Sequence, residues 1–148
     1  INYTYGQNGL LNSINGALPS ISYSLGQPNQ RRYANNLSTN LTYDPNTNRI
    51  TRIATSNLQN LRYSYDSVGN LMQINDTIHQ SIYTLSYDDL DRLISASKVS
   101  AGVTDFSFNY TYGPTGNINT METLNGAYTY IYGIYGPPAH APVWVGVE

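Results

Sequence analysis

Short stretches of this chain alternate between aromatic or aliphatic residues and Thr, Ser or Ile, and each stretch ends at a tyrosine. The stretches are Tyr3–Tyr5, Tyr63–Tyr65, Leu85–Tyr87, Tyr110–Tyr112 and Tyr130–Tyr132. Alternation with a period of two is typical of a β-strand whose two faces differ. We therefore expect strands with one apolar, aromatic face and one mostly hydroxylic face.

The closing tyrosine of each stretch recurs along the chain and marks the origin of a repeat. The origins are Tyr5, Tyr43, Tyr65, Tyr87, Tyr112 and Tyr132, with a weaker copy at Leu25. Successive origins are 18 to 25 residues apart, which is the length of one β-hairpin. The spacing predicts a tandem array of hairpins.

A residue that tolerates the left-handed backbone region follows each origin after four residues, or after five in the copy at Tyr43. These predicted turn residues are Gly9, Asn48, Gly69, Asp91, Gly116 and Gly136. Gly, Asn and Asp enter positive φ at the least steric cost, so the position is expected to close a tight turn. Asp44, Asp66 and Asp88 directly follow their origin tyrosines and are expected to cap the free N–H groups of the turn.

Aliphatic residues resume after the turn with a spacing that breaks the alternation. The first positions are Leu11, Ile50, Leu71, Leu93 and Ile118, and the next come three residues later at Ile14, Ile53, Ile74, Ala96 and Met121. A step of three predicts a β-bulge or a strand that ends early. The expected fold class is all-β, built from consecutive antiparallel hairpins over residues 1–136, followed by a Pro-rich extended tail over residues 137–148.

The repeated motif Tyr-x-Tyr-Asp-x-x-Gly-Asn-Leu resembles the YD repeat of the Rhs family. It is complete at Tyr63–Leu71 and nearly so at Leu41–Ile50, Leu85–Leu93 and Tyr110–Ile118. That family includes bacterial Rhs toxins, the cocoon-forming subunits of insecticidal toxin complexes, and the teneurin adhesion proteins. The resemblance implies a curved or spiralling sheet of hairpins that encloses a hollow shell in complete members, and it implies cargo encapsulation, adhesion or carbohydrate contact. The chain has about six or seven repeats, and the C-terminal self-cleaving segment of the family is not found in it.

Charged residues make up only 11% of the chain, and the net charge is −2. A surface hydrated by neutral hydroxyl and amide groups favours an extracellular location. The sequence has no cysteine, so disulfides and thiolate metal sites are excluded. Five sequons mark potential glycosylation sites at Asn2, Asn36, Asn40, Asn75 and Asn109, although the Asn-rich composition alone could produce them. The seven cations are scattered in sequence, so a nucleic-acid partner is not expected, and no apolar run is long enough to span a membrane.

No arrangement typical of an enzyme or of a bound cofactor or metal is found in the sequence. The acidic stretch Asp88–Asp91 lacks the further ligands of a calcium loop, and His79 and His140 have no ligand partner at suitable spacing, so both are expected in exposed loops. No nucleophile elbow or phosphate-binding glycine loop occurs. We expect a non-enzymatic protein without cofactors.

The fifteen tyrosines allow two interpretations. Either equivalent tyrosines of neighbouring hairpins stack and bury apolar area while each phenol finds a hydrogen-bond partner, or exposed rings form an adhesive or sugar-binding surface. The tail also allows two interpretations. It adds as a strand to a neighbouring sheet through Val143, Trp144 and Val145, or these residues fold back on the sheet of their own chain.

Three functions follow from these observations. The first is a structural module that associates through its sheet edges into a fibre or shell wall. The second is a glycan- or receptor-binding adhesin segment, and the third is part of a cargo-enclosing toxin-complex shell. The expected partners are copies of the chain or neighbouring repeats, and in the second case glycans.

Overall fold

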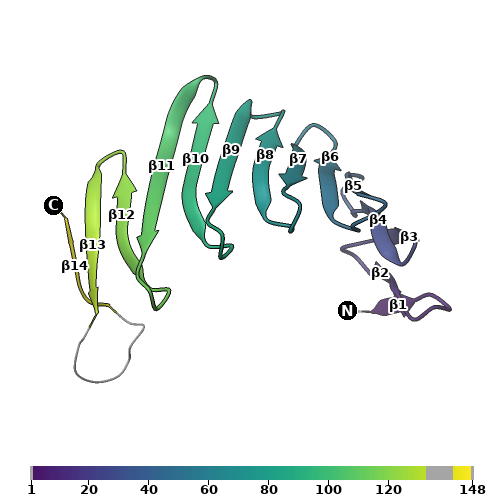
Figure 1. Cartoon of the computed structure of the whole chain (residues 1–148). Coiled ribbons are helices and arrows are strands. Elements are labelled where there is room, and N and C mark those ends of the chain that lie inside the picture. Colours follow the sequence, from purple (N-terminus) through teal and green to yellow (C-terminus); the bar gives the residue numbers. More distant parts are fainter. Residues whose placement is uncertain (1, 133–141, 148) are drawn as a thin grey trace. The chain divides into compact units, whose positions relative to one another are not determined.

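A computed structural model describes residues 2–132 and 142–147, and the side chains of Val143, Trp144 and Val147 are not described. Figure 1 shows strands joined by short turns, with no helix in these ranges. The predicted class, all-β with consecutive antiparallel hairpins, is confirmed. The strands are β1 (Tyr3–Tyr5), β2 (Leu11–Ile14), β3 (Ser20–Ser24), β4 (Gln27–Arg32), β5 (Ser38–Tyr43), β6 (Ile50–Thr55), β7 (Gln59–Tyr65), β8 (Leu71–Asp76), β9 (Ser81–Tyr87), β10 (Leu93–Ser100), β11 (Val103–Tyr112), β12 (Ile118–Thr123), β13 (Gly126–Tyr132) and β14 (Pro142–Val147).

The chain forms two compact units. The first comprises residues 1–64 and 74–80, and the second comprises residues 65–73 and 81–148. In the first unit, β1 pairs with β2, and β3 to β7 follow one another in sequence order. In the second unit, β9 to β14 do the same. Sequence neighbours are therefore sheet neighbours, as an array of hairpins requires.

The predicted bulge is present and falls directly after the first aliphatic residue that follows the turn. Thr42 pairs with Arg52 but Tyr43 pairs with Ile50, which leaves Thr51 without a partner in β5. The same shift separates Ser13 from Leu11 in β2 and Thr120 from Ile118 in β12. The three-residue step in the sequence is thus the signature of one extra residue in the second strand of each hairpin.

The hairpin of β3 and β4 corrects the origin that the sequence pattern placed at Leu25. Tyr23 pairs with Pro28, and the register shifts immediately before this pair, as it does at the other origin tyrosines. Leu25 and Gly26 are themselves the turn, with φ of 51° and 81°, and Leu25 is 97% exposed. A two-residue turn with two positive φ values closes this hairpin, so its tyrosine stands two residues earlier than the spacing predicted.

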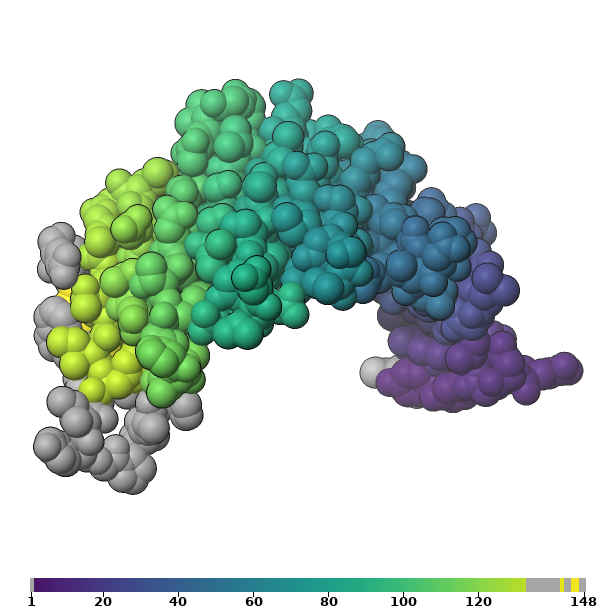
Figure 2. Space-filling view, in the orientation of Figure 1, coloured from purple at the N-terminus to yellow at the C-terminus, as the bar shows by residue number. Residues whose placement is uncertain are grey.

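The hydrophobic side chains form a layer without a closed core. Among the described residues, none of the hydrophobic side chains is fully buried, and most of those on the strands are half-buried. Figure 2 shows the side chains of β9 to β13 (teal to yellow) next to one another along the sheet. The free energy of folding must therefore come from strand pairing and from contacts between adjacent hairpins rather than from a closed interior.

The C-terminal strand belongs to the array. β14 is antiparallel to β13, and the register shifts between the pairs of Ile131 with Trp144 and Tyr132 with Pro142, as in the other hairpins. Residues 144 and 145 thus pair with the chain's own β13, and residue 143 is the extra residue at the register shift, as in the second of the two alternatives for the tail. The sequence pattern instead divided the chain at residue 136, and Gly136 lies outside the described residues.

Replacing a turn glycine tests whether positive φ stabilises the hairpins. Gly116 has φ of 86°, and Gly116→Ala should lower the free energy of unfolding by about 1 kcal/mol, because an L side chain is strained there. Asn48→Gly is the matched control, since Asn48 already has φ of 57° and glycine adopts that backbone without strain. Urea unfolding followed by circular dichroism measures both, and equal stability of Gly116→Ala and the parent would contradict the prediction.

Candidate functional site

The turn after Tyr65 shows how one aspartate organises a hairpin end. Asp66 Oδ1 accepts hydrogen bonds from the backbone N–H of Val68, Gly69 and Asn70, at 3.1, 2.7 and 2.8 Å. Partial burial raises the pKa of the Asp66 carboxyl, but these N–H groups outweigh it, so the pKa lies below its ordinary value of 3.8. Gly69 has φ of 115° in the same turn.

Asp44 and Asp88 occupy the equivalent positions and make equivalent contacts. Asp44 Oδ1 accepts the backbone N–H of Thr47 at 2.8 Å, and this bond is the main cause of its lowered pKa. Asp88 Oδ1 accepts the N–H of Arg92 at 3.0 Å, while its Oδ2 lies 2.6 Å from Arg92 Nη2 and 2.7 Å from Nε. The bond from the Arg92 side chain is the largest contribution that lowers the pKa of Asp88. Three further predicted turn residues among those described also have positive φ, with Gly9 at 74°, Asn48 at 57° and Asp91 at 60°.

In two of the copies that the structure describes, glycine replaces the aspartate, and an asparagine side chain lies against that position. A β-carbon placed on Gly113 would be 3.0 Å from Asn119 Oδ1, and one placed on Gly6 would be 3.2 Å from Asn12 Oδ1. Asn12 and Asn119 are the extra residues of their bulges. The bulge residue thus occupies space next to the missing carboxylate, so the turn keeps a polar side chain there.

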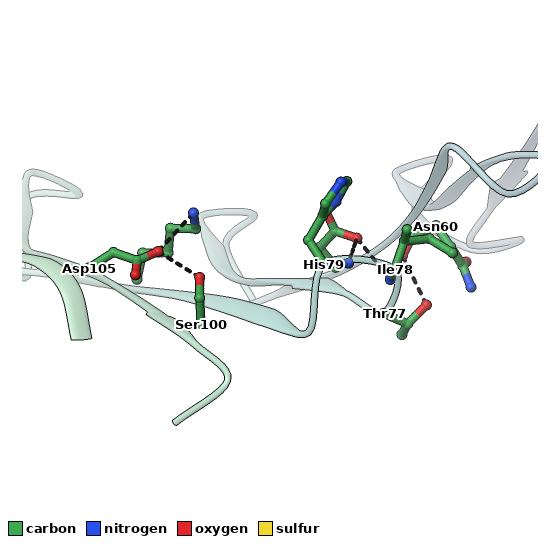
Figure 3. Close-up of polar contacts among 8 residues, drawn as sticks. Asn60, Thr77, Ile78, His79, Ser100 and Asp105 are labelled. Atoms are coloured by element: carbon green, nitrogen blue, oxygen red, sulfur yellow. Dashed lines mark hydrogen bonds and ion pairs between the residues drawn. The ribbon is translucent and has the colours of Figure 1, made fainter. Parts of the chain in front are cut away.

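A fourth capping aspartate, Asp76, is the last residue of β8, and the repeat pattern does not indicate it because it lies off the repeat. Its Oδ1 accepts the N–H of Ile78 at 3.0 Å and of His79 at 3.2 Å, and His79 Nδ1 lies 2.6 Å from Oδ2 (Figure 3). Burial raises the pKa of Asp76, but the bonds from His79 and Ile78 bring it below the ordinary value. His79 thus has a carboxylate neighbour that the sequence pattern did not indicate, and its side chain is 67% exposed. His140 lies outside the described residues.

The repeat tyrosines connect one hairpin to the preceding one through their phenol groups. The Tyr112 hydroxyl donates to the Leu93 carbonyl at 2.7 Å, and the Tyr87 hydroxyl donates to the Leu71 carbonyl at 3.0 Å. In the first unit, Tyr23 donates to Leu11 at 2.7 Å and Tyr43 to Pro28 at 2.9 Å. Three of these acceptors pair with the tyrosine of the previous hairpin: Leu93 with Tyr87, Leu11 with Tyr5 and Pro28 with Tyr23.

Ring contacts involve residues that the repeat did not identify. Tyr83, Phe106, Phe108 and Tyr110 form a row with centroid separations of 6.2, 5.2 and 6.3 Å. Phe106 and Phe108 belong to β11, which is longer than its partner β12. Near them, Lys98 Nζ and Ser100 Oγ lie 2.8 and 2.6 Å from Asp105 Oδ2, the latter contact drawn in Figure 3. The contacts of this row run along β11 and across to Tyr83 in β9, and they differ from the predicted stacking between equivalent tyrosines of neighbouring hairpins.

Polar contacts also join successive turns. Asn70 Nδ2 donates to Asp66 Oδ2 at 3.0 Å and to Asp91 Oδ1 at 2.6 Å, which connects two neighbouring turns. The Arg92 guanidinium lies 4.6 Å from the centre of the Tyr112 ring in the next hairpin. The turn end of the second unit is therefore a connected network rather than a set of separate loops.

The remaining predicted positions show no reactive arrangement. Asn2, Asn36, Asn40 and Asn109 are exposed, and Asn75 is half-buried. In the part of the chain that the structure describes, no group of three or more His, Cys, Asp or Glu side chains could hold a metal ion. That part also contains no helix of the length and apolarity needed to cross a membrane.

The fold is similar to that of solved structures of a toxin complex. The chain superposes on a structure entitled TcdB2-TccC3 with a TM-score of 0.79 and 22% identity, covering 99% of this chain and 9% of that one. It also superposes on the TcdB2-TccC3-Cdc42 structure, with a TM-score of 0.76 and 23% identity over 90% of this chain and 9% of that one. A third similar structure is the Photorhabdus luminescens Tc holotoxin pore, with a TM-score of 0.76 and 23% identity. The superposition covers 89% of this chain and 8% of that one. No family model and no curated protein matches the sequence.

Removing one phenol hydroxyl tests the tyrosine contacts between hairpins. Tyr112→Phe should lower the free energy of unfolding by about 1 kcal/mol, because the Leu93 carbonyl loses its donor. Tyr110→Phe, on the same strand, removes a hydroxyl for which no backbone acceptor is seen in the described residues, and it should change stability by less than about 0.5 kcal/mol. Urea unfolding compares the two, and a reversed order would refute the role assigned to Tyr112.

The aspartate caps predict a dependence of stability on pH. Because the pKa of Asp88 is lowered on folding, its contribution is present above the ordinary value of 3.8 and is lost as pH falls through the folded value. Asp88→Asn should therefore flatten the acid side of the curve of stability against pH. Asp89→Asn, at an exposed position in the same turn, is the control and should leave the slope nearly unchanged. Identical curves for Asp88→Asn and the parent would show that the cap contributes nothing.

Proposed function

We propose that this chain is a non-enzymatic wall segment of a secreted or cell-surface YD-repeat protein, which associates through its sheet edges into a fibre or shell wall. The observation that carries the proposal is the single layer of half-buried side chains, with none of the described hydrophobic residues fully buried. Such a layer becomes more stable when further strands extend it or when another surface covers it, because more apolar area is then buried. The low content of charged residues supports an extracellular site.

The edge of β14 is where such an extension would occur. In the described residues β14 has one sheet neighbour, β13, so its outer side presents backbone N–H and C=O groups to any added strand. Val145 is 47% exposed on this strand. A strand with few charges and no further neighbour is a template for pairing with another copy or with another repeat.

The fold likeness favours a second candidate, in which the segment forms part of a cargo-enclosing toxin-complex shell. The chain spans about a tenth of the length of the chains in the TcdB2-TccC3 structures, so a closed wall of that kind needs many more hairpins. Either architecture could use the turn motif at Tyr63–Leu71 and the tyrosine contacts between hairpins. Both features involve only one hairpin and its neighbour, so they can recur in a sheet of any length.

A charged residue on the edge strand tests the association. The parent chain should form concentration-dependent oligomers in analytical ultracentrifugation, and Val145→Lys should shift them toward monomer, because a lysine at a sheet edge opposes strand addition. Ile82→Lys in β9 is the matched control, since Ile82 is 40% exposed on a strand with neighbours on both sides. Negative-stain electron microscopy then distinguishes fibres from closed shells. A parent chain that stays monomeric at every concentration would overturn the proposal.

A further inference from the structure

The two units carry opposite net charges. The first contains five arginines against Asp44 and Asp76, which gives a net charge of +3. The second contains Arg92 and Lys98 against seven carboxylates, which gives a net charge of −5. The whole-chain value of −2 is therefore the difference between a basic unit and an acidic one.

Three of the five arginines lie on one face of the first unit. Thr42 pairs with Arg52, which in turn pairs with Arg62, so the two guanidiniums lie on the same side of adjacent strands. Arg32 pairs with Ser38 in β5, and Ser38 shares a face with Asn40 and Thr42 because residues two apart along a strand point the same way. The arginine face is defined as Arg32, Arg52 and Arg62. These cations are separated in sequence, and the sheet brings them together.

The arginine face lacks a counter-charge. Among the described residues, the ion pairs involve His79, Arg92 and Lys98, and none involves these three arginines. Arg52 and Arg62 are directly opposite each other, and like charges at such positions destabilise a sheet. Arg52 Nε donates to Asn60 Oδ1 at 2.8 Å, which orients one guanidinium without neutralising it. A carboxylate from outside this unit would relieve the repulsion and accept paired N–H groups.

The second unit presents carboxylates at its turn end. The acidic turn edge is defined as Asp66, Asp88, Asp89 and Asp91, with Arg92 as the one cation in these two turns. Asn70 bonds both Asp66 and Asp91, so carboxylates of two successive turns lie close together. Asp89 and Asp91 are exposed. The capping hydrogen bonds fix the backbone of these turns, and the acidic turn edge keeps an excess of negative charge.

We infer that the arginine face of one copy binds the acidic turn edge of a second copy. The argument is charge complementarity: each surface carries an excess of charge of one sign, and the same chain carries both. Two different patches in contact make a heterologous interface, which continues from copy to copy instead of closing as a dimer. The inference rests on the proposed function, since it gives the association of copies a second contact besides strand pairing.

Exchanging charges between copies tests this contact. Arg62→Glu and Asp89→Lys should each weaken self-association at least about fivefold at low salt, because each places like charges in contact. An equimolar mixture of the two variants should recover association, since the carboxylate introduced by Arg62→Glu then meets the ammonium that Asp89→Lys introduces on the other copy. Raising the salt concentration from about 0.05 M to about 0.5 M should weaken self-association of the parent chain by a similar factor. Sedimentation velocity measures all of these, with circular dichroism to confirm that each variant is folded.

The control is an arginine on the opposite face. Arg31 pairs with Thr39 and lines a hollow with Ile21, Tyr23 and Tyr33, so Arg31→Gln changes the net charge as Arg62→Gln does but leaves the arginine face intact. Arg31→Gln should self-associate as strongly as the parent chain, whereas Arg62→Gln should self-associate more weakly. Association that is insensitive to salt and to Arg62 overturns the inference and leaves the proposed function standing, whereas a parent chain that never associates overturns both. Binding of a fluorescent single-stranded DNA that depends on Arg62, without any effect of Arg62→Gln on self-association, would assign the face to nucleic acid and overturn the inference.

Discussion

The bond from a tyrosine hydroxyl to a backbone carbonyl of the preceding hairpin is the interaction on which the array most depends. A sheet without a closed core has only two ways to fix one hairpin against the next, namely strand pairing and contacts across the face. Tyr112 bonds to Leu93, at the position where the previous hairpin bulges, and Tyr87 bonds to Leu71. The ring covers apolar area while its hydroxyl satisfies a carbonyl, so one side chain provides both kinds of stabilisation.

The turns provide the second constraint, and they tolerate several chemical solutions. Asp66 caps three N–H groups by itself, Asp88 recruits Arg92, and Asn119 lies beside Gly113 where no aspartate is present. Asp66 and Asp88 accept bonds from backbone donors that the reversal of the chain leaves free, and Asn119 places a polar group beside the turn. This explains why the copies in the sequence are degraded at individual positions but keep a common length.

In an array of this kind, different positions of each hairpin stabilise the fold and present polar groups to the surroundings. The aromatic and aliphatic face provides burial, while the hydroxylic face and the turns are free to carry charge. The arginine face in the first unit and the acidic turn edge in the second both lie on these freer positions. Association of copies or repeats is consistent with a layer that has no fully buried hydrophobic residue in its described part.

The sequence by itself determined the hairpins, their order and their bulges, because period, turn residues and the three-residue step are local properties of a strand–turn–strand unit. It failed where a contact lies outside the repeat. Asp76 caps N–H groups of an off-period turn, Phe106 and Phe108 join the ring contacts from a longer strand, and Leu25 was assigned to a strand position because the spacing hid a two-residue turn. Only the tertiary structure placed Arg32, Arg52 and Arg62 on one face and paired β14 with β13, because strand register brings together residues that are far apart in the chain and no local pattern specifies such neighbours.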